Sequence, residues 1–190
     1  MVNRQSGHIT AESQVLSSST MRSLSLKDGR KVVIRAYTPA DKEGLVSMYA
    51  DLSEETLRWS LPPYDRKKIE RWTTDLENRI ILLAFSGDKV VGHLQITSYA
   101  AERLKGIGDL VIYLHQDFQK AGMGAALMKE GIGLARARGW HRIALRVVAD
   151  NHRAINLYEK MGFRKEGLSR DNYFGADGKY HDEVEMGLLL

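Results

Sequence analysis

The feature that most limits the fold is a glycine-spaced junction, Gln119-Lys-Ala-Gly-Met-Gly124, where a strand pattern passes directly into a helix pattern. Residues 109–115 are rich in apolar side chains and predict a strand, and residues 122–138 carry apolar side chains at helical spacing. Glycines at such a junction let backbone N–H groups turn toward one point, where the helix dipole favours an anion. The junction therefore predicts a phosphate-binding loop, although its bare pattern also fits an ordinary tight turn.

Two well-known phosphate-binding loops do not fit this junction. No Gly-Lys-Ser/Thr follows it, so it is not a P-loop. The G-x-G-x-x-G fingerprint of dinucleotide-binding folds is absent, and no acidic residue follows about 20 residues later at a strand end.

Strands and helices are predicted along most of the chain. Strands are expected at 31–37, 80–85, 90–97, 141–147 and 180–190, and helices are expected to begin near Asp41, Asp65 and Asn151. Apolar residues Ile69, Trp72 and Leu76 are expected on one helical face. The pattern predicts an α/β (mixed α+β) domain over residues 26–190, preceded by a flexible extension over residues 1–25, which are rich in Ser and Thr.

Composition excludes several classes of protein. The chain of 190 residues has no cysteine, which excludes disulfides and a thiolate nucleophile, and its six histidines show no metal-ligand spacing, so we predict no metal. No apolar run approaches the roughly 20 residues that span a bilayer, so no membrane contact is predicted. Basic residues alternate with acidic ones and do not form a patch, which argues against nucleic acid. A cytoplasmic protein fits these observations.

A second motif follows the junction, and the two motifs together resemble one protein family. The block Asn151-His-Arg-Ala-Ile-Asn-Leu-Tyr-Glu-Lys-Met-Gly-Phe163 resembles the N-x-x-A-x-x-L-Y-E-K-x-G-F signature of the GNAT superfamily of acyl-CoA N-acyltransferases. The Q-x-x-G-x-G junction resembles the acetyl-CoA-binding loop of the same superfamily, and the resemblance covers roughly residues 31–190. It implies a mixed, mostly antiparallel sheet flanked by helices and splayed between the cofactor-binding strand and the next. It also implies acetyl transfer from acetyl-CoA to a primary amine.

The resemblance assigns residues to the cofactor. The loop amides would bind the pyrophosphate, and the loop comprises Gln119, Lys120, Ala121, Gly122, Met123, Gly124 and Ala125. A side chain at Gly124 is expected to block the phosphates. The backbone of Tyr113, Leu114 and His115 would pair with the pantetheine arm, as a peptide adds to a sheet edge. Asn151 would contact the cofactor, and Tyr158 would give a proton to the leaving thiolate.

The reaction also needs a group that takes the proton of the amine. Asp109 is the only acidic residue on the strand before the loop, and its position resembles that of the glutamate base of lysine acetyltransferases in this superfamily. Because aspartate is shorter, a bridging water would be needed. An aspartate at a strand end can instead bond to a turn, and Glu102 and Asp182 are the other candidates.

The sequence leaves the acceptor open. A protein N-terminus, a lysine side chain, a polyamine, an amino acid or an amino-bearing antibiotic would each fit, and one wall of the acceptor pocket is expected from Tyr49, Glu54, Glu55, Arg58, Trp59 and Tyr64. A non-catalytic acyl-CoA sensor is the alternative, but a sensor needs neither Tyr158 nor Asp109. The interpretation as a nucleic-acid-associated protein depends on the net charge of +4 alone. A homodimer is possible.

Overall fold

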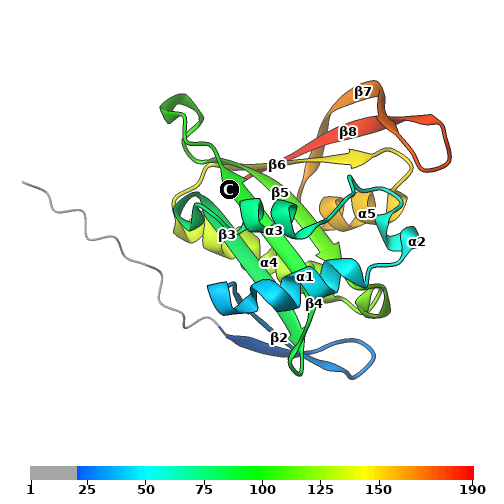
Figure 1. Cartoon of the computed structure of the whole chain (residues 1–190). Helices are drawn as coiled ribbons and strands as arrows, with labels where there is room; N and C mark the ends of the chain where they lie inside the picture. The colour runs from blue at the N-terminus through cyan, green and yellow to red at the C-terminus, as the bar shows by residue number, and fades with distance from the viewer. Residues whose placement is uncertain (1–20) are drawn as a thin grey trace, which may run out of the picture.

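The computed structural model describes residues 21–190, which form one eight-stranded sheet with helices on both faces (Figure 1). The strands are β1 (Arg22–Ser25), β2 (Lys31–Ala36), β3 (Arg79–Ser86), β4 (Lys89–Ser98), β5 (Ile107–Leu114), β6 (Arg142–Val148), β7 (Arg164–Phe174) and β8 (Tyr180–Leu189). The helices are α1 (Lys42–Ala50), α2 (Glu54–Leu57), α3 (Arg66–Trp72), α4 (Met123–Ala137) and α5 (His152–Lys160), with short 3-10 turns η1 (Pro39–Asp41), η2 (Leu76–Asn78), η3 (Glu102–Leu104) and η4 (Gln116–Phe118).

The sheet order is β1-β2-β3-β4-β5-β6-β8-β7, and every neighbouring pair is antiparallel except β5 and β6. Those two strands run parallel and pair only from Ile107↔Arg142 to Asp109↔Ala144. Beyond Asp109 they diverge, as the two ribbons in Figure 1 show. We call the gap between residues 110–114 of β5 and residues 145–148 of β6 the wedge; its closed end is at Asp109, and its open end is at Leu114 and Val148.

Two hydrophobic cores cover the two faces of the sheet. Helices α4 and α5 pack on one face, which is behind the sheet in Figure 1, and their core includes Leu94, Leu127 and Ile143. Helices α1 and α3 lie on the opposite face, where Leu45, Ile69 and other side chains form the second core. Because side chains alternate along a strand, each central strand serves both cores.

The motifs take the local structures that their residues predict. The side chain of Asn151 caps α5 by accepting from the Ala154 N–H at 3.2 Å, and Gly162 ends that helix with a φ of 93°. Phe163 then turns back, with its N–H donating to the Tyr158 carbonyl at 3.0 Å. These contacts fix the second motif against the sheet.

The mixed sheet, its flanking helices and the splay agree with the sequence prediction. Two details differ. Residues 22–25, which were predicted to belong to the flexible extension, pair with β2 as the edge strand β1, because Leu24 packs against the first core. Leu76 does not share a helical face with Ile69 and Trp72, because α3 ends at Trp72 and Leu76 is exposed in η2. Residues 1–20 lie outside the described part of the chain.

Candidate active site

The glycine junction forms the start of α4. Lys120 and Gly122 both have left-handed backbones, with φ values of 62° and 92°, and α4 begins at Met123. The N–H of Ala126 bonds to the Gly122 carbonyl at 3.2 Å, so the N–H groups of the residues before Ala126 precede the first turn of helical bonds. A helix start of this kind presents free donors to an anion.

Gly124 has a packing role that the sequence did not predict. A Cβ there would lie 3.2 Å from Leu114 Cδ1 and 3.1 Å from Leu157 Cδ2. The glycine therefore lets α4 approach β5 and α5 closely. A larger residue at this position would press on apolar side chains, whatever it does to a bound phosphate.

The side chain of Gln119 bonds to α2, β5 and α5 at the open end of the wedge. Its Nε2 donates to Thr56 Oγ1 at 3.1 Å and to the Leu114 carbonyl at 3.2 Å, and its Oε1 accepts from Arg153 Nη1 at 2.6 Å. Its own backbone N–H already donates to the Gln116 carbonyl at 3.2 Å. Gln119 thus connects the loop to α2 and α5 through its side chain.

Four tyrosines gather around the wedge. Tyr158 is buried with its ring 6.0 Å from that of Phe163, and burial raises the pKa of Tyr158 to about 12. Burial also raises the pKa of Tyr113 well above its ordinary value, and the nearby Tyr64, Tyr158 and Tyr173 raise it further. The hydroxyls of Tyr64 and Tyr113 are 2.5 Å apart. Tyr158 thus keeps its proton at neutral pH, as a general acid must.

The remaining cofactor candidates, Asn151 and His115, lie at the open end of the wedge. Asn151 commits its side-chain oxygen to the α5 cap and leaves its amide NH₂ for other partners. His115 directly follows β5, and its Nε2 lies 3.1 Å from Asp51 Oδ2. The structure therefore brings both predicted residues to the edge of the wedge, beside α4 and α5.

The carboxylates that were proposed as bases lie in different places. Asp109 is exposed at the closed end of the wedge, in the last β5–β6 pair, and its Oδ2 accepts from the Tyr99 hydroxyl. Glu102 is exposed and near Lys105. Asp182 accepts from the Asp171 N–H at 2.9 Å, which holds a bulge in β7. Of these three, Asp109 alone borders the wedge.

One carboxylate near the open end was missed by sequence reasoning. Glu183 on β8 lies opposite Val148 of β6, and its charge contributes to the raised pKa of Tyr173, whose largest cause is burial. Its Oε2 accepts from Asn172 Nδ2 at 2.6 Å. No short-range signal marks it, because it reaches the site only through the pairing of distant strands.

The six residues predicted for the acceptor wall do not all lie together. Tyr49 and Tyr64 stack with ring centroids 4.9 Å apart, and Trp59 lies edge-on to His181 at 5.0 Å. The segment around Trp59 is held on the C-terminal hairpin by Tyr173, whose hydroxyl donates to the Ser60 carbonyl at 2.8 Å. Glu54, Glu55 and Arg58 are exposed, and the Arg58 guanidinium lies over the Trp59 ring, 4.7 Å from its centroid.

A row of polar side chains crosses the sheet on the α1/α3 face, with His93 and Gln95 buried and Arg79 and Thr97 partly buried. Thr97 Oγ1 on β4 accepts from Arg79 Nη1 of β3 at 3.0 Å and from Gln95 Nε2 at 2.8 Å, and Thr97 lies opposite Asp109 of β5. Three buried atoms find no partner within residues 21–190: Arg79 Nε, Gln95 Oε1 and His93 Nε2. Leaving a buried polar group unpaired costs about 1–3 kcal/mol, so such atoms need an explanation.

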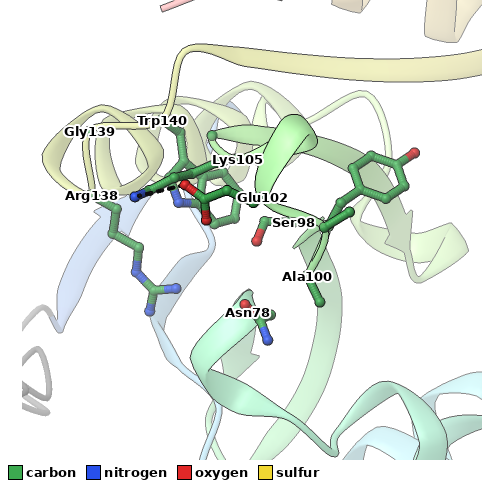
Figure 2. Close-up of a pocket in the computed structure, with 11 residues that line it drawn as sticks. Asn78, Ser98, Ala100, Glu102, Lys105, Arg138, Gly139 and Trp140 are labelled. Atoms are coloured by element: carbon green, nitrogen blue, oxygen red, sulfur yellow. Dashed lines mark ion pairs between the residues drawn. The ribbon is translucent and has the colours of Figure 1, made fainter.

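A separate cavity of about 260 Å³ lies at the far end of α4 (Figure 2). Its wall includes Asn78, Ser98, Arg138 and Trp140, with Glu102 and Lys105 paired at its rim. Since α4 has 15 residues, this cavity is about 22 Å from the glycine junction. It is therefore not the phosphate site.

None of the helices within residues 21–190 is long and apolar enough to cross a membrane. In the same part of the chain no three His, Asp or Glu side chains are grouped to hold a metal ion.

Comparison with known proteins gives a consistent result. Residues 45–163 match the profile of the Acetyltransferase (GNAT) family. The L-amino acid N-acetyltransferase of Escherichia coli (strain K12) is 30% identical over 82% of this chain and 96% of its own length. The ribosomal protein bS18 alanine N-acetyltransferase of that strain is 36% identical, over 42% of this chain and 53% of its own length. An acetyltransferase structure of the GNAT family from Streptococcus pneumoniae superposes with a TM-score of 0.73 and 29% identity, over 84% of this chain and 99% of its own.

Proposed function

This chain belongs to the GNAT family of acetyltransferases, which move an acetyl group from acetyl-CoA to an amine, and we propose that its acceptor is the primary amine of a small molecule. The longest curated match described above supports this acceptor, because it includes both the cofactor motifs and much of the acceptor side. The bS18 match spans only 79 residues, so it says less about the acceptor.

The wedge carries the proposal. Among residues 21–190, residues 110–114 of β5 have no strand partner on the β6 side, so the backbone groups there that make no other bond are available to an extended ligand. Phosphates bound at Gly122, Met123, Gly124 and Ala125 would start such a ligand at the open end. The backbone of Tyr113, Leu114 and His115 would then guide its arm toward the closed end, past Asn151. The thioester would come to lie between Tyr158 and Asp109.

The proposed chemistry is direct transfer. Asp109 takes a proton from the amine through a water molecule, and the neutral nitrogen attacks the thioester carbonyl. The carbon–sulfur bond breaks as the tetrahedral intermediate collapses. Tyr158 gives its proton to the departing thiolate. The nitrogen releases its second proton as the amide forms, which restores Tyr158 through solvent, and Asp109 passes its proton to bulk water.

Paired glycine variants test the cofactor site. An L-residue in a left-handed backbone costs about 1–2 kcal/mol. In Gly122→Ala, acetyl-CoA binding would have to restore the left-handed backbone at residue 122 against that cost. We expect acetyl-CoA affinity to fall about tenfold or more, measured as a smaller ligand-induced rise in melting temperature. Gly178→Ala carries similar strain, with a φ of 74° and open space for the Cβ, but lies in the turn between β7 and β8. It should keep the full acetyl-CoA response, and an equal loss in both variants would contradict the loop assignment.

A further inference from the structure

The polar row on the α1/α3 face has more hydrogen-bonding capacity than the fold uses. Gln95 is 3% exposed and His93 is fully buried, yet each retains an unpartnered polar atom within residues 21–190. Arg79 adds a third, its Nε. These three side chains come from the two adjacent strands β3 and β4 and lie on one face, so the surplus is concentrated in one place.

Two of the three unpartnered atoms, Arg79 Nε and His93 Nε2, are N–H donors, and the third is the amide oxygen of Gln95, an acceptor. Burial lowers the pKa of His93 to about 3, so its ring is neutral, and Tyr49 Oη lies 2.8 Å from its Nδ1. The Tyr49 hydroxyl has no other acceptor among the described residues, so it donates to Nδ1 and leaves the ring proton on Nε2. Arg79 Nε is always a donor. The Gln95 amide can also be turned over. Its oxygen then accepts from the Thr97 hydroxyl, and its NH₂ becomes the unpartnered group and a further donor.

The row also lies beside the proposed reaction centre. Arg79, Thr97 and Asp109 are directly opposite one another on three successive strands, and Gln95 lies opposite Val111. Neighbouring strands are about 4.8 Å apart. A group held by Gln95 and Arg79 is therefore one or two strands from Asp109, on the same face of the sheet.

We propose that Arg79 and Gln95, with the Nε2–H of His93 as a further donor, bind the carboxylate of an α-amino acid whose amine is acetylated. A guanidinium is well suited to a carboxylate, and the amine is attached to the carbon next to that carboxylate. The amine would then face Asp109 and the wedge. A polyamine has no group for these donors, since it brings only further cations. This inference rests on the proposed function and adds the class of acceptor.

Three acceptors separate the possibilities: an L-amino acid, its amide, and the amine that lacks the carboxyl group. A full panel of such sets is screened with thiol-release detection in the wild-type protein. We expect the acid to be favoured over both others by about 10–100-fold in kcat/KM, the range typical of charged hydrogen bonds. Equal use of the amide would overturn the carboxylate site and indicate a peptide N-terminus. Equal use of the amine would overturn it while leaving small-amine acetylation intact, and no thiol release with any acceptor would contradict the proposed function itself.

Variants of the polar row then test whether Arg79 and Gln95 cause the preference for a carboxylate. Gln95→Leu and Arg79→Met should raise KM for the amino acid by about 10–100-fold and leave KM for the carboxyl-free amine unchanged. Arg79→Lys keeps the positive charge and should recover part of the loss. Ile81→Val, a buried change on β3 directly opposite Gln95, should lower thermal stability without separating the two acceptors. If the row variants behave like Ile81→Val, the row is structural and the proposal fails.

Discussion

The cofactor side and the acceptor side of the wedge are built in different ways. The cofactor side, from Gln119 to Phe163, offers mainly backbone groups that two local motifs arrange, and its helix ends are set by Gly122, Asn151 and Gly162. The acceptor side depends on side chains from β3, β4, β5, α3 and the C-terminal hairpin, which meet only in the folded chain. Backbone recognition tolerates sequence change, whereas side-chain recognition varies with it. This contrast explains why the family is easier to assign than the acceptor.

Tyr158 offers the strongest test of the contrast, because it is a side chain on the cofactor side. Tyr158→Phe keeps the ring against Phe163 and removes the proton donor. We expect turnover to fall by about 10²–10⁴-fold with little change in acetyl-CoA affinity. The pKa of about 12 means that this loss should persist across the neutral pH range.

The measurement is steady-state turnover with acetyl-CoA binding followed in parallel. Tyr180→Phe removes an exposed hydroxyl from the C-terminal hairpin and serves as the matched control. Undiminished turnover in Tyr158→Phe would remove Tyr158 from the mechanism and leave the cofactor side with backbone contacts alone.

Asp109 tests the acceptor side in turn. Asp109→Asn should lower the rate at neutral pH by about 10-fold or more, because an amine with a pKa near 10 then has no group to take its proton. Raising the pH should recover part of the rate, because the amine arrives already neutral. Glu183→Gln is the matched carboxylate variant at the other end of the wedge, and the pH–rate profiles of both are compared with the folded fraction measured alongside. If Glu183→Gln shows the recoverable loss and Asp109→Asn does not, the base is Glu183.

The local structure of the cofactor side could be predicted from the sequence because its signals are local. The Gln119–Gly124 junction, the Asn151 cap and the Gly162 stop each depend on a few consecutive residues, and the splay follows from the family resemblance. The packing role of Gly124 was missed, since Leu114 and Leu157 meet it from two separate elements. The same reason hid the polar row and Glu183, which need the strand register. The cytoplasmic location and the homodimer stay predictions.

The smallest effect is expected where the two sides touch, at His181. Its Nδ1 lies 2.6 Å from Asp150 Oδ2, just before α5, and its Nε2 lies 3.0 Å from Asp177 Oδ1 in the C-terminal turn. Only a protonated imidazole donates from both nitrogens. The hydrogen bond with Asp177 and then that with Asp150 raise the pKa of His181 above its ordinary value of 6.5. The contact is therefore strongest when the ring is charged.

The sign of the pH dependence follows from that raised pKa. Protonation is more favourable in the folded than in the unfolded chain, so the stabilisation is fully present below about pH 6.5 and is lost as the pH rises through the folded-state pKa. Asp177→Asn should thus lower the melting temperature slightly at about pH 5.5 and hardly at all at about pH 9, since exposed ion pairs contribute little. His141→Gln, which changes an exposed histidine with no carboxylate in ion-pair range among residues 21–190, should show no such trend. A melting difference for Asp177→Asn that stays constant with pH would mean that His181 is neutral in the fold. The segment around Trp59, whose ring packs on His181, would then be held by packing and not by charge.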